Sequence, residues 1–149
     1  MRVIIQRSGK SSVSINNEIV GQIDKGYVLL VGVGQEDTKE DADYLARKVS
    51  NMRLFEDEDG KTNLSLSQVD GEILSISQFT LYASTKKGNR PSFIYAGEPD
   101  KANELYEYFN QKLRENGFKV EVGQFGANMQ VSIMNDGPVT IILDSKNKE

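Results

Sequence analysis

Residues 26–33 constrain the fold of this chain more than any other segment. They read GYVLLVGV and contain no charged side chain. An apolar run of this length is typical of a strand that is buried on both faces. We therefore expect the strand to lie inside a sheet that other elements cover.

Two segments with helical spacing follow. Thr38 is placed to cap a first helix, because Asp41 follows three residues later and apolar side chains recur at helical spacing as far as Met52. Pro99 takes the favoured first-turn position of a second helix, which Gly117 ends. Each segment has one apolar face, so we expect the first helix to pack on the sheet and the second to face the core.

The remaining segments predict strands and turns. Asn16 and Asn17 tolerate a positive φ and predict a hairpin. The acidic segment 56–60 lacks the ligand spacing of a calcium-binding loop, which favours a solvated hairpin tip. The expected strands are residues 2–7, 13–15, 19–23, 26–33, 72–81, 118–122, 129–134 and 139–144. The sequence thus predicts an α+β fold with a curved, largely antiparallel, barrel-like sheet system and two packed helices.

Length and charge narrow the setting. The chain has 149 residues, which suits one domain over residues 1–145 followed by a polar tail at 146–149. No apolar run approaches membrane-spanning length, so we expect a cytoplasmic location and no membrane partner. The net charge of −4 argues against non-specific coating of nucleic acid. The basic cluster at residues 86–90 is either a solvated loop or a contact for a few phosphates.

The chain contains no histidine and no cysteine. This absence excludes a Ser-His-Asp triad, a cysteine nucleophile and the usual zinc sites. We predict neither a metal nor a cofactor. Any chemistry must come from backbone amides, hydroxyls, carboxylates or the substrate.

Two peptides are candidates for that chemistry. The hydroxyls of Ser77 and Thr80 have no base within their motif, so backbone N–H groups at the strand end are better suited to stabilise an oxyanion. From the residues alone, a strand whose Ser and Thr side chains pair across the sheet is the favoured interpretation. Gly137-Pro138 is compatible with a trans turn or with a cis bond that presents two carbonyls to a ligand.

A family resemblance separates these alternatives. Three motifs together resemble the D-aminoacyl-tRNA deacylases, and the similarity runs from Arg2 to about Asp144. Two further segments, 51–55 and 89–93, also resemble that family. The three motifs are residues 77–81 (SQFTL), 123–129 (GQFGANM) and 135–140 (NDGPVT).

The resemblance implies a homodimer with active sites at the subunit interface and the 3′ acceptor end of aminoacyl-tRNA as partner. Gly137-Pro138 would be cis and would form a chirality filter that reaches into the pocket of the other subunit, braced by Arg7. The Phe79 amide would be the oxyanion donor. The pocket lining would comprise Ser77, Gln78, Phe79 and Thr80, with Ala127 and Met129 as supporting residues.

The implied activity is hydrolysis of the ester bond of D-aminoacyl-tRNA, and of glycyl-tRNA mischarged on alanine tRNA. Two alternatives remain from the residues. A non-enzymatic module that binds an RNA end or a nucleotide would explain the lack of ionisable catalytic groups. A serine or threonine hydrolase of small esters would turn over substrates without RNA.

Overall fold

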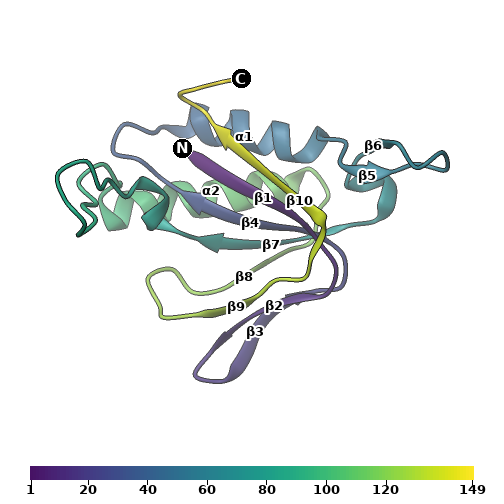
Figure 1. Ribbon diagram of the computed structural model, residues 1–149, viewed down its shortest axis with the longest axis horizontal. Coiled ribbons are helices and arrows are strands. Elements are labelled where there is room, and N and C mark those ends of the chain that lie inside the picture. The colour runs from purple at the N-terminus through teal and green to yellow at the C-terminus, as the bar shows by residue number, and fades with distance from the viewer.

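The computed structural model describes residues 1–149 as an α+β fold built around a five-stranded sheet (Figure 1). The strand order is β10-β1-β4-β7-β8. A second sheet has the order β3-β2-β9, and β5 pairs with β6. The strands are β1 (Arg2–Ser8), β2 (Ser11–Ile15), β3 (Glu18–Ile23), β4 (Gly26–Gly32), β5 (Phe55–Glu56), β6 (Thr62–Leu64), β7 (Glu72–Ser77), β8 (Val120–Val122), β9 (Gln130–Ser132) and β10 (Asn135–Asp144).

The large sheet is mixed. β1 is antiparallel to both of its neighbours, β10 and β4, whereas β7 is parallel to β4 and to β8. The other three pairings are antiparallel, and none of the sheets closes on itself. The α+β class and the largely antiparallel pairing are therefore confirmed, with open sheets in place of a barrel.

β4 is buried on both faces, as its apolar sequence predicts. Tyr27, Leu29 and Val31 belong to the main core, together with the apolar faces of the helices. Val28 points to the opposite face and joins a smaller core with residues of β2, β3 and β7. The smaller core consists of Val13, Ile23, Val28, Leu74 and Ile76.

Two helices, α1 (Lys39–Asn51) and α2 (Pro99–Glu115), pack against each other and cover the main core. Thr38 caps α1, and its backbone N–H donates to the Asp41 carboxylate at 2.9 Å. α2 starts at Pro99 and ends before Gly117, which has a φ of +97°. Both sets of caps match the sequence prediction. Neither helix is long and apolar enough to cross a membrane.

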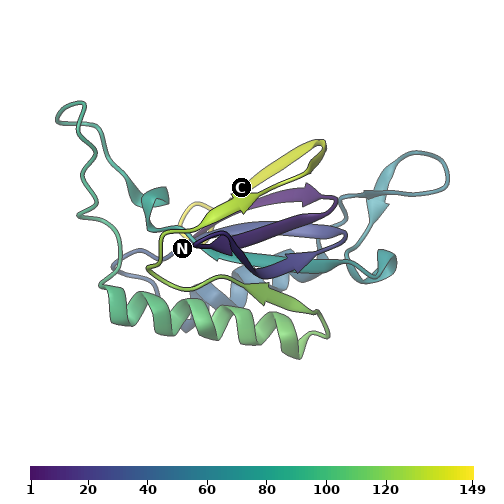
Figure 2. The same ribbon diagram turned by 90° about the horizontal axis from the view of Figure 1, so that it is seen from below.

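Short elements and projections complete the fold. Asn16 and Asn17 turn the β2–β3 hairpin with φ values of 51° and 67°. Residues 56–60 form the tip of the β5–β6 hairpin, as predicted. That hairpin and the loop between residues 83 and 97 project from opposite ends of the molecule (Figure 2). The 3-10 helices are η1 (Ser67–Val69) and η2 (Phe79–Tyr82).

Two of the strands predicted after the second helix are shorter than expected. The strand predicted over residues 118–122 starts at Val120, because the Phe118 N–H donates to the Leu113 carbonyl and so closes the end of α2. The strand predicted over residues 129–134 ends at Ser132. Beyond it, the Met134 N–H donates to the Ser11 hydroxyl, a contact that replaces a ladder hydrogen bond.

Candidate active site

The predicted strand over residues 72–81 ends early, at Ser77. Gln78 makes the last sheet contact, donating its N–H to the Val31 carbonyl at 2.7 Å, and residues 79–82 then form η2. The reason lies on β4, where a Cβ at Gly32 would sit 3.0 Å from the Leu81 Cβ. Because Gly32 has no side chain, η2 can fold across the end of β4.

The side chains of residues 77–80 lie at the surface where β7 ends and η2 begins, which we call the Ser77–Thr80 corner. Phe79 is 55% exposed and Thr80 is exposed. The Gln78 side-chain amide donates to the Thr80 hydroxyl at 2.7 Å, and neither Thr80 nor Ser77 hydrogen-bonds to a carboxylate or an amine. A hydroxyl nucleophile needs such a base. The geometry within one chain therefore does not activate either hydroxyl.

The backbone of η2 is better suited to bind negative charge. The first N–H groups of a helix have no acceptor within the helix. Phe79 and Thr80 occupy these first positions of η2, and the Phe79 ring beside them is exposed. A donor directed at a developing oxyanion contributes about 3 kcal/mol to transition-state stabilisation.

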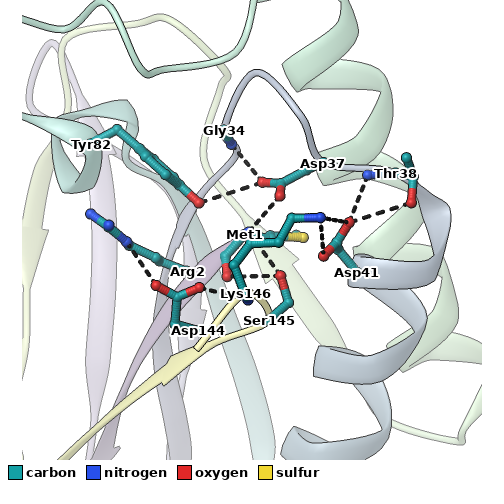
Figure 3. A network of polar contacts seen from close by, with 10 residues as sticks. All are labelled: Met1, Arg2, Gly34, Asp37, Thr38, Asp41, Tyr82, Asp144, Ser145 and Lys146. Atoms are coloured by element: carbon teal, nitrogen blue, oxygen red, sulfur yellow. Dashed lines mark hydrogen bonds and ion pairs between the residues drawn. The ribbon is translucent and has the colours of Figure 1, made fainter. Parts of the chain in front are cut away.

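Arg2 anchors η2 from the start of β1. Its Nη1 donates to the Leu81 carbonyl at 2.7 Å, and its guanidinium lies 4.5 Å from the centroid of the Tyr82 ring. Its Nε donates to Asp144 at 3.1 Å (Figure 3). Arg2 thus joins the end of β10 to the segment that carries Phe79.

A buried polar network lies beneath this anchor (Figure 3). The Met1 ammonium binds the Asp37 carboxylate at 2.7 Å, with both side chains almost fully buried, and donates to the Ser145 hydroxyl at 2.9 Å. Burial raises the pKa of Tyr82, and the Asp37 and Asp144 carboxylates reinforce the shift. Tyr82 consequently stays neutral near pH 7 and does not serve as a base.

The end of the chain packs against α1 in the same network. The Lys146 ammonium lies 3.2 Å from the Asp41 carboxylate, and Lys148 lies 4.4 Å from the centroid of the Tyr44 ring. Burial acts to raise the pKa of Asp41, but hydrogen bonds from Ser145 and Thr38 and the nearby Lys146 outweigh it and hold the pKa at about 2. Residues 146–148 are therefore in contact with the domain.

The NDGPVT motif, residues 135–140, forms an outward bulge at the start of β10. Asn135 pairs with Ser8, and Thr140 pairs with Gln6. More residues therefore lie between Asn135 and Thr140 on β10 than between Gln6 and Ser8 on β1, and the extra residues bulge out of the sheet. Gly137 and Pro138 are exposed in this bulge, and the bond between them is cis, as the resemblance implies. Gly137 has a φ of +127°. This conformation is one that residues with a Cβ rarely adopt.

Arg7, at the end of β1, holds the bulge from below. Its Nε donates to the Asp136 carbonyl at 3.2 Å, and its Nη1 donates to the Leu54 carbonyl at 2.7 Å. The side chain is only 9% exposed and also lies 3.5 Å from the Asp136 carboxylate. The contact expected of Arg7 is present, and its role in the site stays a prediction.

The two motifs lie at opposite ends of the sheet within one chain. The strand registers place Ser77 beside Val31, whereas the bulge lies between the levels of Gly26 and Val28. Three to five residues along β4 separate the motifs by about 10 to 17 Å, and three strand spacings across the sheet separate them by about 14 Å. None of the five main cavities of the chain is lined by residues 77–80 or by Gly137 and Pro138. One chain alone does not bring the motifs together.

The GQFGANM motif, residues 123–129, connects β8 to β9. Met129 packs against the smaller core, which includes Ile76, the residue before Ser77. Its sulfur accepts from the Gln124 N–H at 3.4 Å. The half-buried Ala127 belongs to the same turn, where its N–H donates to the Gln124 carbonyl at 3.1 Å. Met129 thus contacts the core that also holds Ile76, whereas no hydrogen bond joins Ala127 to residues 77–80.

Arg2 and Tyr82 were not predicted as site residues. Tyr82 lies one position beyond the recognised motif, and Arg2 is a charged residue at the start of an otherwise ordinary strand. The available signal was indirect. Only β4 separates β1 from the motif strand β7, so a long basic side chain at the start of β1 can reach the segment that follows β7.

Comparison with known proteins gives consistent matches over the whole chain. The family model described as D-Tyr-tRNA(Tyr) deacylase matches residues 4–144. Two proteins named D-aminoacyl-tRNA deacylase, from Bacillus cereus strains G9842 and B4264, are 57% and 56% identical over 146 residues. These alignments cover 98% of this chain and 100% of each relative.

Solved structures share the fold. A structure described as c-Myc DNA Unwinding Element Binding Protein has a TM-score of 0.90 at 40% identity, covering 97% of this chain and 98% of that chain. Another, of a probable eukaryotic D-amino acid tRNA deacylase, has a TM-score of 0.83 at 17% identity and covers 95% of this chain and 97% of that one. The chain belongs to the D-Tyr-tRNA(Tyr) deacylase family and is a hydrolase of the aminoacyl-tRNA ester.

Proposed function

We propose that this chain works as a homodimer that hydrolyses D-aminoacyl-tRNA, and glycyl-tRNA mischarged on alanine tRNA, to free amino acid and tRNA. Each active site would combine the Ser77–Thr80 corner of one subunit with the Gly137-Pro138 bulge of the other. The opposite placement of these two motifs in one chain carries the proposal. A two-fold dimer would form such a composite site twice, because each subunit presents both motifs.

The chemistry we propose depends on the backbone and on the substrate. A water oxygen attacks the ester carbonyl carbon, and the Phe79 N–H stabilises the negative charge that develops on the carbonyl oxygen. The bond from that carbon to the ribose 3′ oxygen then breaks. The vicinal 2′ hydroxyl relays the water proton to the leaving oxygen. This route needs neither a histidine nor a hydroxyl nucleophile on the protein.

Chirality would follow from geometry. If the amino group and the ester are both fixed, an L side chain points into the exposed backbone of Gly137 and Pro138, whereas a D side chain points away from it. Glycine has no Cβ and would pass the same filter. The enzyme would thus reject L substrates by steric exclusion and would accept glycine.

A deacylation assay tests the activity. Matched D- and L-tyrosyl-tRNA, and glycyl-tRNA made with alanine tRNA, are incubated with the protein, and released amino acid is measured. Release from the D and glycyl substrates alone is expected. Binding without release would favour the RNA-end module, and turnover of small esters without RNA would favour a serine or threonine hydrolase.

The ribose relay has a separate test. A substrate that carries the amino acid on the 3′ oxygen of a 2′-deoxy terminal adenosine should bind but react far more slowly. Equal rates on the ribose and deoxyribose substrates would refute the relay.

Subunit mixing tests the composite site. Phe79→Pro removes the backbone donor at a first helical position that tolerates proline, and Phe79→Ala is its control because it keeps the amide. Phe79→Pro and Gly137→Ala homodimers should both be inactive. A heterodimer of the two variants retains one site with both motifs intact, so mixing should restore activity. A mixture that forms heterodimers but stays inactive would place both motifs in one subunit's site.

A further inference from the structure

The loop between β-bridge partners Ser84 and Ser92 carries an unusual concentration of positive charge. Lys86, Lys87 and Arg90 are all exposed in it, and none takes part in the six ion pairs of the chain. Residues 83–97 contain no carboxylate, although the whole chain has a net charge of −4. We call residues 84–92 the basic finger.

The basic finger is closed at its base and projects from the molecule (Figure 2). Ser84 and Ser92 exchange two backbone hydrogen bonds, each of 2.8 Å, and Gly88 turns the tip with a φ of +157°. The Gly88 N–H donates to the Thr85 carbonyl at 3.3 Å, so the chain turns back at residues 86–87. The three cations therefore lie on the projecting loop.

The base of the basic finger is fixed to the candidate active site. The Phe93 ring meets the Phe79 ring edge to face, with centroids 5.0 Å apart. Behind it, the Gln35 N–H donates to the Tyr95 carbonyl at 3.2 Å, and the Gly97 N–H donates to the Val33 carbonyl at 2.8 Å. These contacts hold the base of the basic finger beside the segment that carries Phe79.

The surface between the tip and the site is aromatic and exposed. Phe79 is 55% exposed, Phe93 37% and Tyr95 58%. Tyr95 also lines a cavity of about 610 Å³ together with Arg2 and Tyr82. Exposed rings near exposed Lys and Arg side chains are the usual surface for unpaired bases, which stack on the rings while the cations contact the phosphates.

We propose that the basic finger binds phosphates near the acceptor end of tRNA, while the exposed rings at its base stack the unpaired 3′ bases and lead the ester to Phe79. This inference rests on the proposed function, because it assigns a place to the RNA part of that substrate. The finger acts on substrate binding alone, and the chemical step stays at η2.

Two substrates separate binding by the finger from catalysis. D-tyrosyl-tRNA presents the whole acceptor end, whereas D-tyrosyl-adenosine presents the same ester with no phosphate. The triple variant Lys86→Gln, Lys87→Gln and Arg90→Gln should raise the KM for the tRNA about 10- to 30-fold, with kcat unchanged. Its kinetics with D-tyrosyl-adenosine should equal those of the wild type.

Salt dependence counts the contacts. Each phosphate contact contributes roughly 0.7 to 0.9 to the slope of log affinity against log salt concentration. The triple variant should therefore lower the magnitude of that slope by about 2 to 3 for the tRNA. The matched control, Arg47→Gln, Lys48→Gln and Lys61→Gln, removes the same charges from exposed positions on α1 and the β5–β6 hairpin, and should leave KM almost unchanged.

Each other outcome overturns the inference in a distinct way. An unchanged KM for the tRNA, or an equal effect of the control variant, shows that the finger makes no specific RNA contact. An equal loss on both substrates places the finger in the catalytic step. A variant that sediments as a monomer shows that the finger belongs to a protein interface. If the wild type releases no amino acid from either substrate, the proposed function fails before the finger is tested.

Discussion

The two ends of β1 hold the two halves of the candidate site in similar ways. Arg2 joins the last residue of β10, Asp144, to the η2 backbone at Leu81, while Arg7 joins Asp136 at the start of β10 to the Leu54 carbonyl. Each arginine therefore links β10 to a segment from another part of the chain. One strand, β1, sets the position of both motifs.

The two anchors differ in burial. The Arg7 side chain is 9% exposed, whereas that of Arg2 is 41% exposed. Removal of a buried guanidinium leaves its carbonyl partners without a donor and away from water. When an exposed guanidinium is removed, water can take its place. The bulge around Gly137 is therefore held more rigidly than η2. This difference suits the filter that we propose, which would exclude L substrates by position, and it predicts unequal responses to substitution.

Gly137→Ala should give the largest effect. Gly137 has a φ of +127°, which strains any residue with a Cβ, and a Cβ there would lie 2.8 Å from the Val139 Cγ2 and 3.0 Å from the Arg7 Nη2, so the bulge or these side chains must shift. We expect a loss of at least about a hundredfold in kcat/KM on D-tyrosyl-tRNA, since misplacement by an ångström costs that much.

The matched control is Gly60→Ala. Gly60 also has a positive φ, of 74°, but a Cβ there meets nothing within 4 Å. This variant should lose some stability and keep its activity. Full activity of Gly137→Ala would exclude the bulge from the site.

Arg7→Lys should come second. A lysine keeps the charge but cannot donate to both carbonyls in the geometry of a guanidinium. We expect about 2 kcal/mol of lost unfolding free energy in urea titration, and a loss of roughly tenfold in discrimination between D- and L-tyrosyl-tRNA. If Arg7→Lys loses stability but discriminates between D and L substrates as well as the wild type, Arg7 supports the fold and takes no part in the proposed filter.

Arg2→Gln should have a smaller effect on stability, below about 1 kcal/mol, because its ion pair with Asp144 is exposed to water. Loss of the hydrogen bond to the Leu81 carbonyl loosens η2. The fold-decrease in kcat should therefore be larger than the fold-change in KM. Arg2→Lys should recover part of kcat through a new contact with Asp144. A loss of stability equal to that of Arg7→Lys would contradict the comparison of the two anchors.

The same comparison shows which features are visible in the sequence. β4, the helix caps and the hairpin at Asn16 and Asn17 were predicted because periodicity, capping residues and tolerance of positive φ act locally. The end of β7 was not, because the alternation of apolar and polar residues continues to Leu81. The break depends on Gly32, which lies on a different strand and gives η2 room to cross.

The candidate site was predictable only in part. The resemblance implied the motif residues and Arg7 as site residues, and their roles stay predictions. The separation of Ser77 from Gly137 required the strand registers, because sequence distance says nothing about which end of a sheet a residue occupies. Arg2 escaped prediction because its contact with Leu81 depends on the packing of η2 over β4.

Thr80→Ala tests the chemistry of the η2 side. The Thr80 hydroxyl accepts from the Gln78 amide and has no basic partner, so removing it should reduce kcat less than about tenfold. A loss beyond about a thousandfold, or an acyl group trapped on Thr80 in mass spectrometry, would contradict catalysis by the backbone.

Acid should weaken the Arg2 end of the molecule through Asp41, which caps α1 and binds Lys146. Because the pKa of Asp41 falls from its ordinary value of 3.8 to about 2 in the folded chain, its contribution to stability is complete above about pH 4 and is lost as the pH falls towards 2. Asp41→Asn should therefore flatten the decline of unfolding free energy between pH 4 and pH 2, while Asp59→Asn, at the exposed hairpin tip, should leave the slope in place. The measurement is a series of urea titrations across that pH range. An equal slope for the wild type and Asp41→Asn would show that the contacts of the Asp41 carboxylate with Thr38, Ser145 and Lys146 add nothing to stability in this pH range.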